Sequence, residues 1–250
     1  NGYADLPLKV LDMGMGQERN AWFTGAAPTS YETTFPTVVK KLQETTGIKV
    51  DKKLLQNFLP YSSYLNVDEV EDIDKTWKFV SKKVGVSSKE LQKQILPLSA
   101  LYSIAEHSRT LLLALSDGIL PSNVGGGYNL RVILRRALSF IDTYQWDVDL
   151  AHLCELHAKY LKPQFPELTE NLKEVADILA VEKKKHEESK KRAQHIVEKL
   201  VQKKEKITTE KLIELYDSQG VNPSQIAEEA MKEKKKIDIP ILRKDFILER

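Results

Sequence analysis

The strongest constraint on the fold is a pair of helix patterns joined by a glycine-rich loop, LSDGILPSNVGGGYNLRVILRRAL, at residues 115–138. Before the loop, residues 96–115 are apolar on nearly every side, which predicts a central, buried helix that ends at Gly118. After the loop, residues 128–142 place apolar side chains at helical spacing along one side. The sequence therefore predicts a core of packed helices.

Helical patterns continue along most of the chain. A proline-bounded helix before residue 50 places Val38, Val39 and Leu42 on its apolar side. Residues 146–161 predict a further helix, and a long, highly charged helix is expected from Leu168 to about Lys206. The sequence therefore predicts a mainly α fold.

The only convincing strand pattern lies near the N-terminus, at residues 8–12, before a bend at Gly14 and Gly16. Near residue 50, strand-like sequence rich in glycine and proline gives way to uninterrupted helix patterns. We therefore predict one domain over residues 1–50 and a helical domain over residues 51–250.

Composition excludes several classes of protein. The formal net charge is only +2, so any affinity for nucleic acid must come from local patches. The single cysteine rules out an internal disulfide, and the histidines form no zinc pattern with it. No apolar run is long enough to span a bilayer and the start has no signal-peptide pattern, so a cytoplasmic protein without a membrane partner is expected. Because the chain starts at Asn1 inside a strand-like segment, we expect it to be a piece of a longer protein.

The glycine-rich loop has the chemistry of a phosphate-facing surface. Glycines at 125–127 let a backbone approach a partner closely at the start of a helix, and Arg131, Arg135 and Arg136 add positive charge. Asn123 carries a short amide that could read a base edge in the shallow minor groove of RNA. The alternative is a tight turn between helices, with solvated arginines and an asparagine that serves the turn.

A second candidate site lies at the N-terminal bend. Asp12 is the last residue of the predicted strand, and an aspartate at a strand end can hold an ammonium group. Arg19 lies three residues after Gly16 of the bend, where an arginine can hold phosphates. The alternative is a strand-to-helix corner with an exposed ion pair.

Three other features favour structural interpretations. His107 beside Glu106 could be a general base, but a core-edge histidine bonded to a neighbour is favoured. The acidic pattern at residues 67–74 favours a solvated helix start over a metal site, because it lacks the glycine-containing loop of a calcium site. Residues 183–206 hold ten Lys and Arg against four Glu, and we favour a solvated helix face over phosphate contacts.

Three separated motifs give the chain a resemblance to a known family. VLDMGMGQERNAW at 10–22 resembles motif 3 of class II synthetases, and residues 104–137 resemble the tRNA-recognition signature of alanyl-tRNA synthetases. LYDSQG at 215–220 resembles the Tyr-Asp turn near the end of that region. The order is that of the family, and the archaeal branch is the most similar. The resemblance implies that residues 1–50 are the C-terminal strand and helix piece of a class II antiparallel α+β aminoacylation domain, and that residues 51–250 form the helical tRNA-recognition domain.

The resemblance also implies roles for the N-terminal residues. Asp12, with Gly14, would hold the amino group of alanine, and Arg19, with Gly16, would bind ATP phosphate. The complete enzyme would use ATP and magnesium to form alanyl-adenylate and esterify it to tRNA. Nothing resembling motifs 1 and 2 is present, so the chain itself is expected to hold no catalytic residue, metal or cofactor and to need the remaining synthetase sequence as its partner. The zinc of the family belongs to an editing domain that the chain lacks.

The same resemblance implies that the helical part reads the tRNA(Ala) acceptor stem. Asn123 and Asp217 would recognise its G·U wobble pair, and Arg131, Arg135 and Arg136 would hold the adjoining phosphates. One departure is Gly126, which stands where the family usually has arginine. Two alternatives stay open: a helical module that binds RNA or protein without sequence preference, and one subunit of a split synthetase.

Overall fold

The computed structural model describes residues 14, 16–49, 51–65 and 72–203, together with the single residues 208, 211, 214, 215 and 226. The chain divides into two compact units, residues 1–176 and residues 177–250, and each is considered by itself. All regular structure in the described residues is helical, which confirms the mainly α prediction. The strand predicted at residues 8–12 lies outside the described residues, and the predicted boundary near residue 50 stays a prediction.

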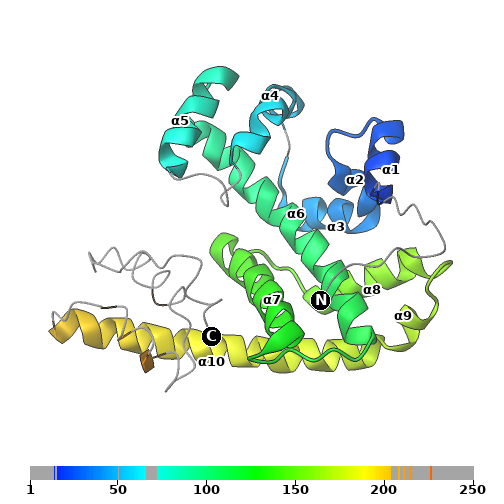
Figure 1. The fold of residues 1–250 in the computed structure, drawn as a ribbon, viewed down its shortest axis with the longest axis vertical. Coiled ribbons are helices and arrows are strands. Elements are labelled where there is room, and N and C mark those ends of the chain that lie inside the picture. The colour runs from blue at the N-terminus through cyan, green and yellow to red at the C-terminus, as the bar shows by residue number, and fades with distance from the viewer. Residues whose placement is uncertain are drawn as a thin grey trace, which may run out of the picture. The chain divides into compact units, whose positions relative to one another are not determined.

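The helices follow one another with short connections (Figure 1). In chain order they are α1 (Gln17–Gly25), α2 (Ser30–Thr34), α3 (Pro36–Thr46), α4 (Lys52–Phe58), the 3-10 helix η1 (Leu59–Leu65), α5 (Ile73–Val84), α6 (Ser88–Ser116), α7 (Gly125–Tyr144), α8 (Leu150–Leu161), α9 (Glu167–Glu170) and α10 (Leu172–Lys203).

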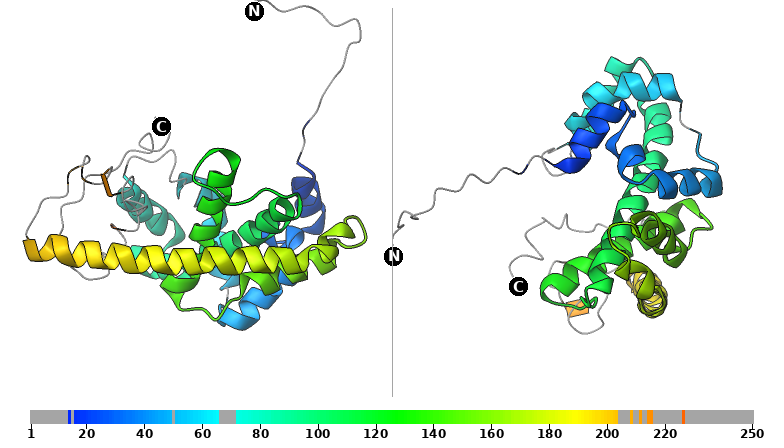
Figure 2. Two further views of the ribbon diagram at one scale, coloured as in Figure 1. Left: turned by 90° about the horizontal axis from the view of Figure 1, so that it is seen from below. Right: turned by 90° about the vertical axis from the view of Figure 1, so that its right-hand side faces the viewer.

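Helix α6 is the centre of the first unit. It packs against α2, α3, α5, α7, α8 and α9, and the right-hand view of Figure 2 shows α4 and α5 at one end of it and α7 at the other. Leu101, Ile104, Leu111 and Leu112 are fully buried, which confirms the predicted buried helix. The helix also begins earlier than predicted, because Ser87 accepts a hydrogen bond from the Glu90 amide and caps it.

Two helices, α2 and α3, replace the single proline-bounded helix predicted before residue 50. Phe35 separates them with φ −126° and ψ 47°, because a residue before proline is disfavoured in the helical region. The predicted apolar side of α3 is confirmed, since Val38, Val39 and Leu42 are buried. Its packing against α6 and α8 brings this part of the chain into the core of the first unit.

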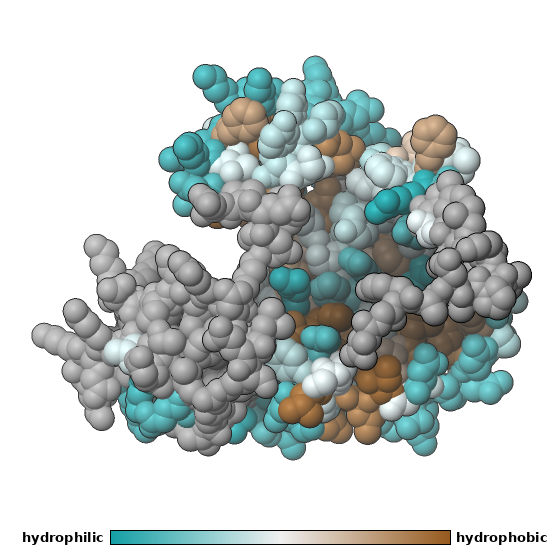
Figure 3. Space-filling view, viewed as in Figure 1, coloured by the Kyte–Doolittle hydropathy of each residue, from teal (hydrophilic) through white to brown (hydrophobic). Residues whose placement is uncertain are grey.

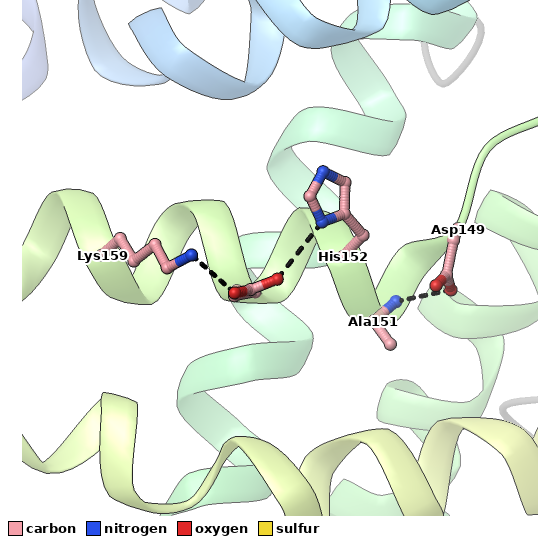
Figure 4. Close-up of polar contacts among 5 residues, drawn as sticks. Asp149, Ala151, His152 and Lys159 are labelled. Atoms are coloured by element: carbon pink, nitrogen blue, oxygen red, sulfur yellow. Dashed lines mark hydrogen bonds and ion pairs between the residues drawn. The ribbon is translucent and has the colours of Figure 1, made fainter.

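Helix α8 shows how local polar contacts set a helix start (Figure 4). Asp149 accepts a hydrogen bond from the Ala151 amide at 3.0 Å, so α8 begins at Leu150 instead of at residue 146. On its exposed side the Glu155 carboxylate lies between His152 at 3.2 Å and Lys159 at 2.6 Å. Hydrogen bonds from Lys159, the larger cause, and from His152 hold the pKa of Glu155 below its usual value.

The long charged helix predicted from Leu168 is interrupted, and its main part is α10. Its basic residues 183–185 are exposed, whereas Glu182, His186 and Ser189 are buried at spacings of four and three residues.

No described helix combines the length and apolar character that a bilayer span requires. On the face in Figure 3, hydrophilic side chains predominate at the top of the view, where α4 and α5 lie.

Candidate functional site

The loop before α7 folds back over the first turn of that helix. The Ser122 amide donates to the Gly127 carbonyl at 3.0 Å, and the Ser122 hydroxyl donates to the Val124 carbonyl at 2.7 Å. Residues 120–124 therefore form a closed turn whose end is attached to the helix that follows. Val124 at its tip is 76% exposed, with Ile119 and Leu120 also exposed beside it.

Two of the three glycines are required by this geometry. Gly125 has φ +60°, in the left-handed region that favours glycine. A Cβ on Gly127 would lie 2.4 Å from the Leu120 carbonyl oxygen and 2.5 Å from the Ser122 hydroxyl, so only glycine lets the loop lie this close to α7. A Cβ on Gly126 would meet nothing within 4 Å. The loop can therefore accept a side chain at Gly126.

Asn123 and Arg131 are joined across this turn. Asn123 is exposed, and the Arg131 Nη1 group donates a hydrogen bond to its Oδ1 atom. The Nη2 group of the same guanidinium donates to the Pro121 carbonyl at 3.0 Å. One arginine on the first turns of α7 thus holds both the backbone and the side chain of the loop.

The other two α7 arginines differ in exposure: Arg135 is half-buried and Arg136 is exposed. Together with Arg131 they place three positive charges on the middle turns of α7. His107 on α6 lies near this charge. Burial, and next the charge of Arg136, lower the pKa of His107 to about 4.

The expected hydrogen bond of His107 is absent at Nε2, which is buried without a partner among the described residues. With its pKa near 4 the ring is neutral at pH 7. A buried ring nitrogen with no proton donor beside it among the described residues gives no support to the general-base alternative.

A different buried polar cluster, between α6 and α8, was missed by the sequence analysis. The His157 Nε2 atom lies 3.0 Å from the Ala105 carbonyl oxygen and 3.1 Å from the Ser108 hydroxyl. Because a carbonyl only accepts, Nε2 carries the proton. The Cys154 thiol donates to the Ser108 carbonyl at 3.4 Å, and burial raises the pKa of this thiol to about 12. The cluster therefore joins the two helices and offers no activated nucleophile.

Of the residues predicted to bind alanine and ATP, the structure describes Gly14, Gly16 and Arg19, which lie at or just before the start of α1. Gly14 and Arg19 are exposed, and the Gly16 carbonyl accepts from the Arg19 amide at 3.1 Å at the start of α1. Helix α1 packs against α2, and no contact joins it to α7 within the described helices. Asp12 and Asp217 lie outside the described residues. The structure thus brings Asn123 together with Arg131, and it keeps α1 apart from that pair.

Comparison with known proteins identifies the family. A family profile described as "tRNA synthetases class II (A)" matches residues 1–247. The chain belongs to this family. It is 43% identical over 227 residues to an alanine–tRNA ligase of Methanocella arvoryzae, covering 91% of this chain and 26% of that protein. An alanine–tRNA ligase of Nitrosopumilus maritimus is 38% identical, covering 90% of this chain and 25% of its own length.

These archaeal proteins confirm the resemblance to alanyl-tRNA synthetases, and a relative from Methanothermobacter thermautotrophicus is still 32% identical over 96% of the chain. The chain spans about a quarter of the length of the curated relatives it matches. It therefore corresponds to one part of such a synthetase. Across residues 14, 16–49, 51–65 and 72–203, no three His, Cys, Asp or Glu side chains come together as metal ligands.

Proposed function

We propose that this chain recognises the acceptor stem of tRNA for an alanine–tRNA ligase, with Asn123 reading the G·U wobble pair. The observation that carries the proposal is the exposed Asn123 amide, fixed on a turn that hydrogen bonds attach to the arginine-bearing helix α7. The names of the relatives support the reaction, and the loop geometry supports the role of this segment.

Physical chemistry divides the work between the loop and the helix. The minor groove of an A-form stem is wide and shallow, so a short side chain on a protruding turn can reach its base edges. Arg135 and Arg136 on α7 would hold phosphates beside that position, which adds affinity without reading sequence. Asp217 is assigned to the same pair as a second reading residue, on the family motif alone.

The aminoacylation step belongs to the whole ligase in this proposal. Arg19 is exposed at the start of α1, where its guanidinium can pair with an ATP phosphate, with Gly16 beside it. Asp12 and Gly14 are assigned to the amino group of alanine. ATP would supply the adenylyl group that activates alanine, with pyrophosphate as the leaving group, while this chain would position substrates for sequence outside it.

Binding of acceptor-stem hairpins tests the proposal. At one fixed salt concentration, the chain should bind a hairpin with G·U more tightly than the same hairpin with G·C, and Asn123→Ala should abolish that preference. A good base contact is worth about 1–3 kcal/mol, or about fivefold to one hundred and fiftyfold. Asn129→Ala is the matched control, because Asn129 is also exposed and lies on the following helix turn.

Equal binding of both hairpins to every variant would contradict the proposal. If that binding also weakened steeply with salt, the result would favour a module that binds RNA without sequence preference. The exposed lysines at 183–185 would then supply the charge for it. Alanine-dependent pyrophosphate exchange that appears only when a second chain is added would identify a split synthetase.

A further inference from the structure

We infer that Arg131 is a positioning residue that orients Asn123, so that the amide nitrogen of Asn123 and not its oxygen is presented to the RNA. This inference rests on the proposed function and deepens it. Arg131 was expected to hold a phosphate. Its hydrogen bonds to Asn123 Oδ1 and to the Pro121 carbonyl instead direct its guanidinium toward the loop of its own chain.

The chemistry of the two side chains fixes the orientation. A guanidinium only donates hydrogen bonds, whereas an amide has an accepting oxygen and a donating nitrogen. The amide oxygen must therefore face Arg131, since the opposite orientation would place donor against donor. The Nδ2 group is then turned away from the guanidinium, on a residue whose side chain is exposed.

The contact to Pro121 makes this orientation stable. Both hydrogen bonds come from one planar group, and Nη2 reaches the Pro121 carbonyl at 3.0 Å while Nη1 reaches Asn123. Because the fork is rigid, the loop backbone and the amide are fixed relative to each other. A lysine at the same place has one point charge on a flexible stem and cannot make the two-point contact.

The orientation predicts which groups of the stem are read. Two N–H donors require acceptors, and the minor groove of RNA offers base nitrogen and oxygen atoms together with the ribose 2′-oxygen. Phosphate binding on α7 is then left to Arg135 and Arg136. Arg131 would thus serve specificity. Arg135 and Arg136, four and five residues further along the chain, would serve affinity.

A charge-conserving substitution distinguishes positioning from phosphate binding. Arg131→Lys should lower the ratio of G·U to G·C affinity by about threefold to tenfold, the cost of leaving one side chain to be ordered on binding. The dependence of affinity on salt should stay the same, because the charge is kept. Arg136→Lys is the matched control and should leave the ratio unchanged. An unchanged ratio in Arg131→Lys would overturn the inference, because charge alone would then be sufficient.

A double-mutant cycle checks that Arg131 acts through Asn123. In the Asn123→Ala background, Arg131→Lys should have no further effect on the G·U to G·C ratio, since the side chain to be oriented is gone. Any change of the ratio in that background would show that Arg131 reads the stem by itself. Arg131→Gln, which removes the charge as well, should lower the ratio and also weaken binding to both hairpins.

A measurement without RNA separates this inference from the proposed function. If the wild-type chain showed no preference for G·U, the proposed function would fail. NMR of the side-chain amides, with asparagine-selective labelling, would still test whether Arg131 orients Asn123. Arg131→Lys should shift the Asn123 amide signals, which Asn123→Ser identifies by their loss, while Arg136→Lys should leave them in place. Asn123 signals unmoved by Arg131→Lys would overturn the positioning role.

Discussion

Two regions of the first unit hold a polar side chain by hydrogen bonds, in opposite surroundings. Between α6 and α8, His157 is buried and donates to the Ala105 carbonyl beside the Ser108 hydroxyl. On the loop before α7, Asn123 is exposed and accepts from Arg131. In the first region a lost contact leaves a buried polar group unpaired, so the bonds hold helices together. In the second region, water can replace a lost contact. The bond therefore sets the orientation of Asn123, and its loss should lower the free energy of unfolding only a little.

The buried region also ties the start of the helical core to its centre. The Phe35 ring lies edge-on to the His157 ring, with centroids 5.7 Å apart, and Arg109 stands 5.4 Å above the Phe35 ring. Nearby, the Tyr102 hydroxyl donates to the Glu32 carboxylate, and burial first and this bond next raise the pKa of Tyr102. The region between α2 and α3 is thus anchored to α6 and α8 by polar and aromatic contacts.

The largest expected effect is a loss of stability in acid, because buried histidines must take up protons. Burial is the main cause that lowers the pKa of His157 to about 4. The charge of Arg109 also lowers this pKa, whereas the hydrogen bond to Ala105 raises it. The pKa of His107 is likewise lowered to about 4. Between pH 6.5 and pH 4 the unfolded chain binds more protons, so each histidine should reduce the free energy of unfolding by up to about 1.4 kcal/mol per pH unit as pH falls. Urea unfolding at a series of pH values measures this slope.

Removing one titrating group provides the control for the acid slope. His107→Gln should reduce the slope between pH 6.5 and pH 4, because one of the two depressed histidines is gone. A slope equal in the wild type and in His107→Gln would mean that other groups carry the acid sensitivity.

Truncating the buried ring should have the next largest effect. His157→Ala leaves a cavity between α6 and α8 and removes the donor to Ala105, so the free energy of unfolding should fall by about 2–4 kcal/mol at pH 7. His152→Ala, five residues away on the exposed side of α8, should change it by less than about 0.5 kcal/mol. Equal losses in the two variants would contradict the contrast between a buried and an exposed histidine on one helix.

The sequence predicted the helices well because hydrophobic spacing records which face is buried. The burial of much of residues 96–115 in α6, and of Val38, Val39 and Leu42 in α3, could be predicted from the apolar pattern alone. The boundaries were less accurate, since they depend on single capping residues such as Ser87 and Asp149. A pattern of apolar residues contains no information on these individual hydrogen bonds.

The sequence could propose residues for the candidate site but not their contacts. Asn123 and Arg131 were proposed from the chemistry of the glycine-rich loop and from the family motif, yet their mutual hydrogen bond depends on how the turn folds back on α7. His157 was missed because a histidine in an apolar helix face carries no sign of its partner. Its partners Ser108 and Ala105 are about fifty residues away in the chain.

The smallest effect on stability is expected in the loop, where two neighbouring glycines give a matched test. Gly127→Ala forces the Leu120 carbonyl away from α7 and should cost about 1–3 kcal/mol. Gly126→Ala enters open space at a helical position and should be neutral, or stabilising by up to about 1 kcal/mol. Gly127→Ala should also shift the Asn123 amide signals, because Ser122 and Asn123 move with the turn, whereas Gly126→Ala should not. If both variants kept stability and signals alike, close packing of the loop on α7 would not be what orients Asn123.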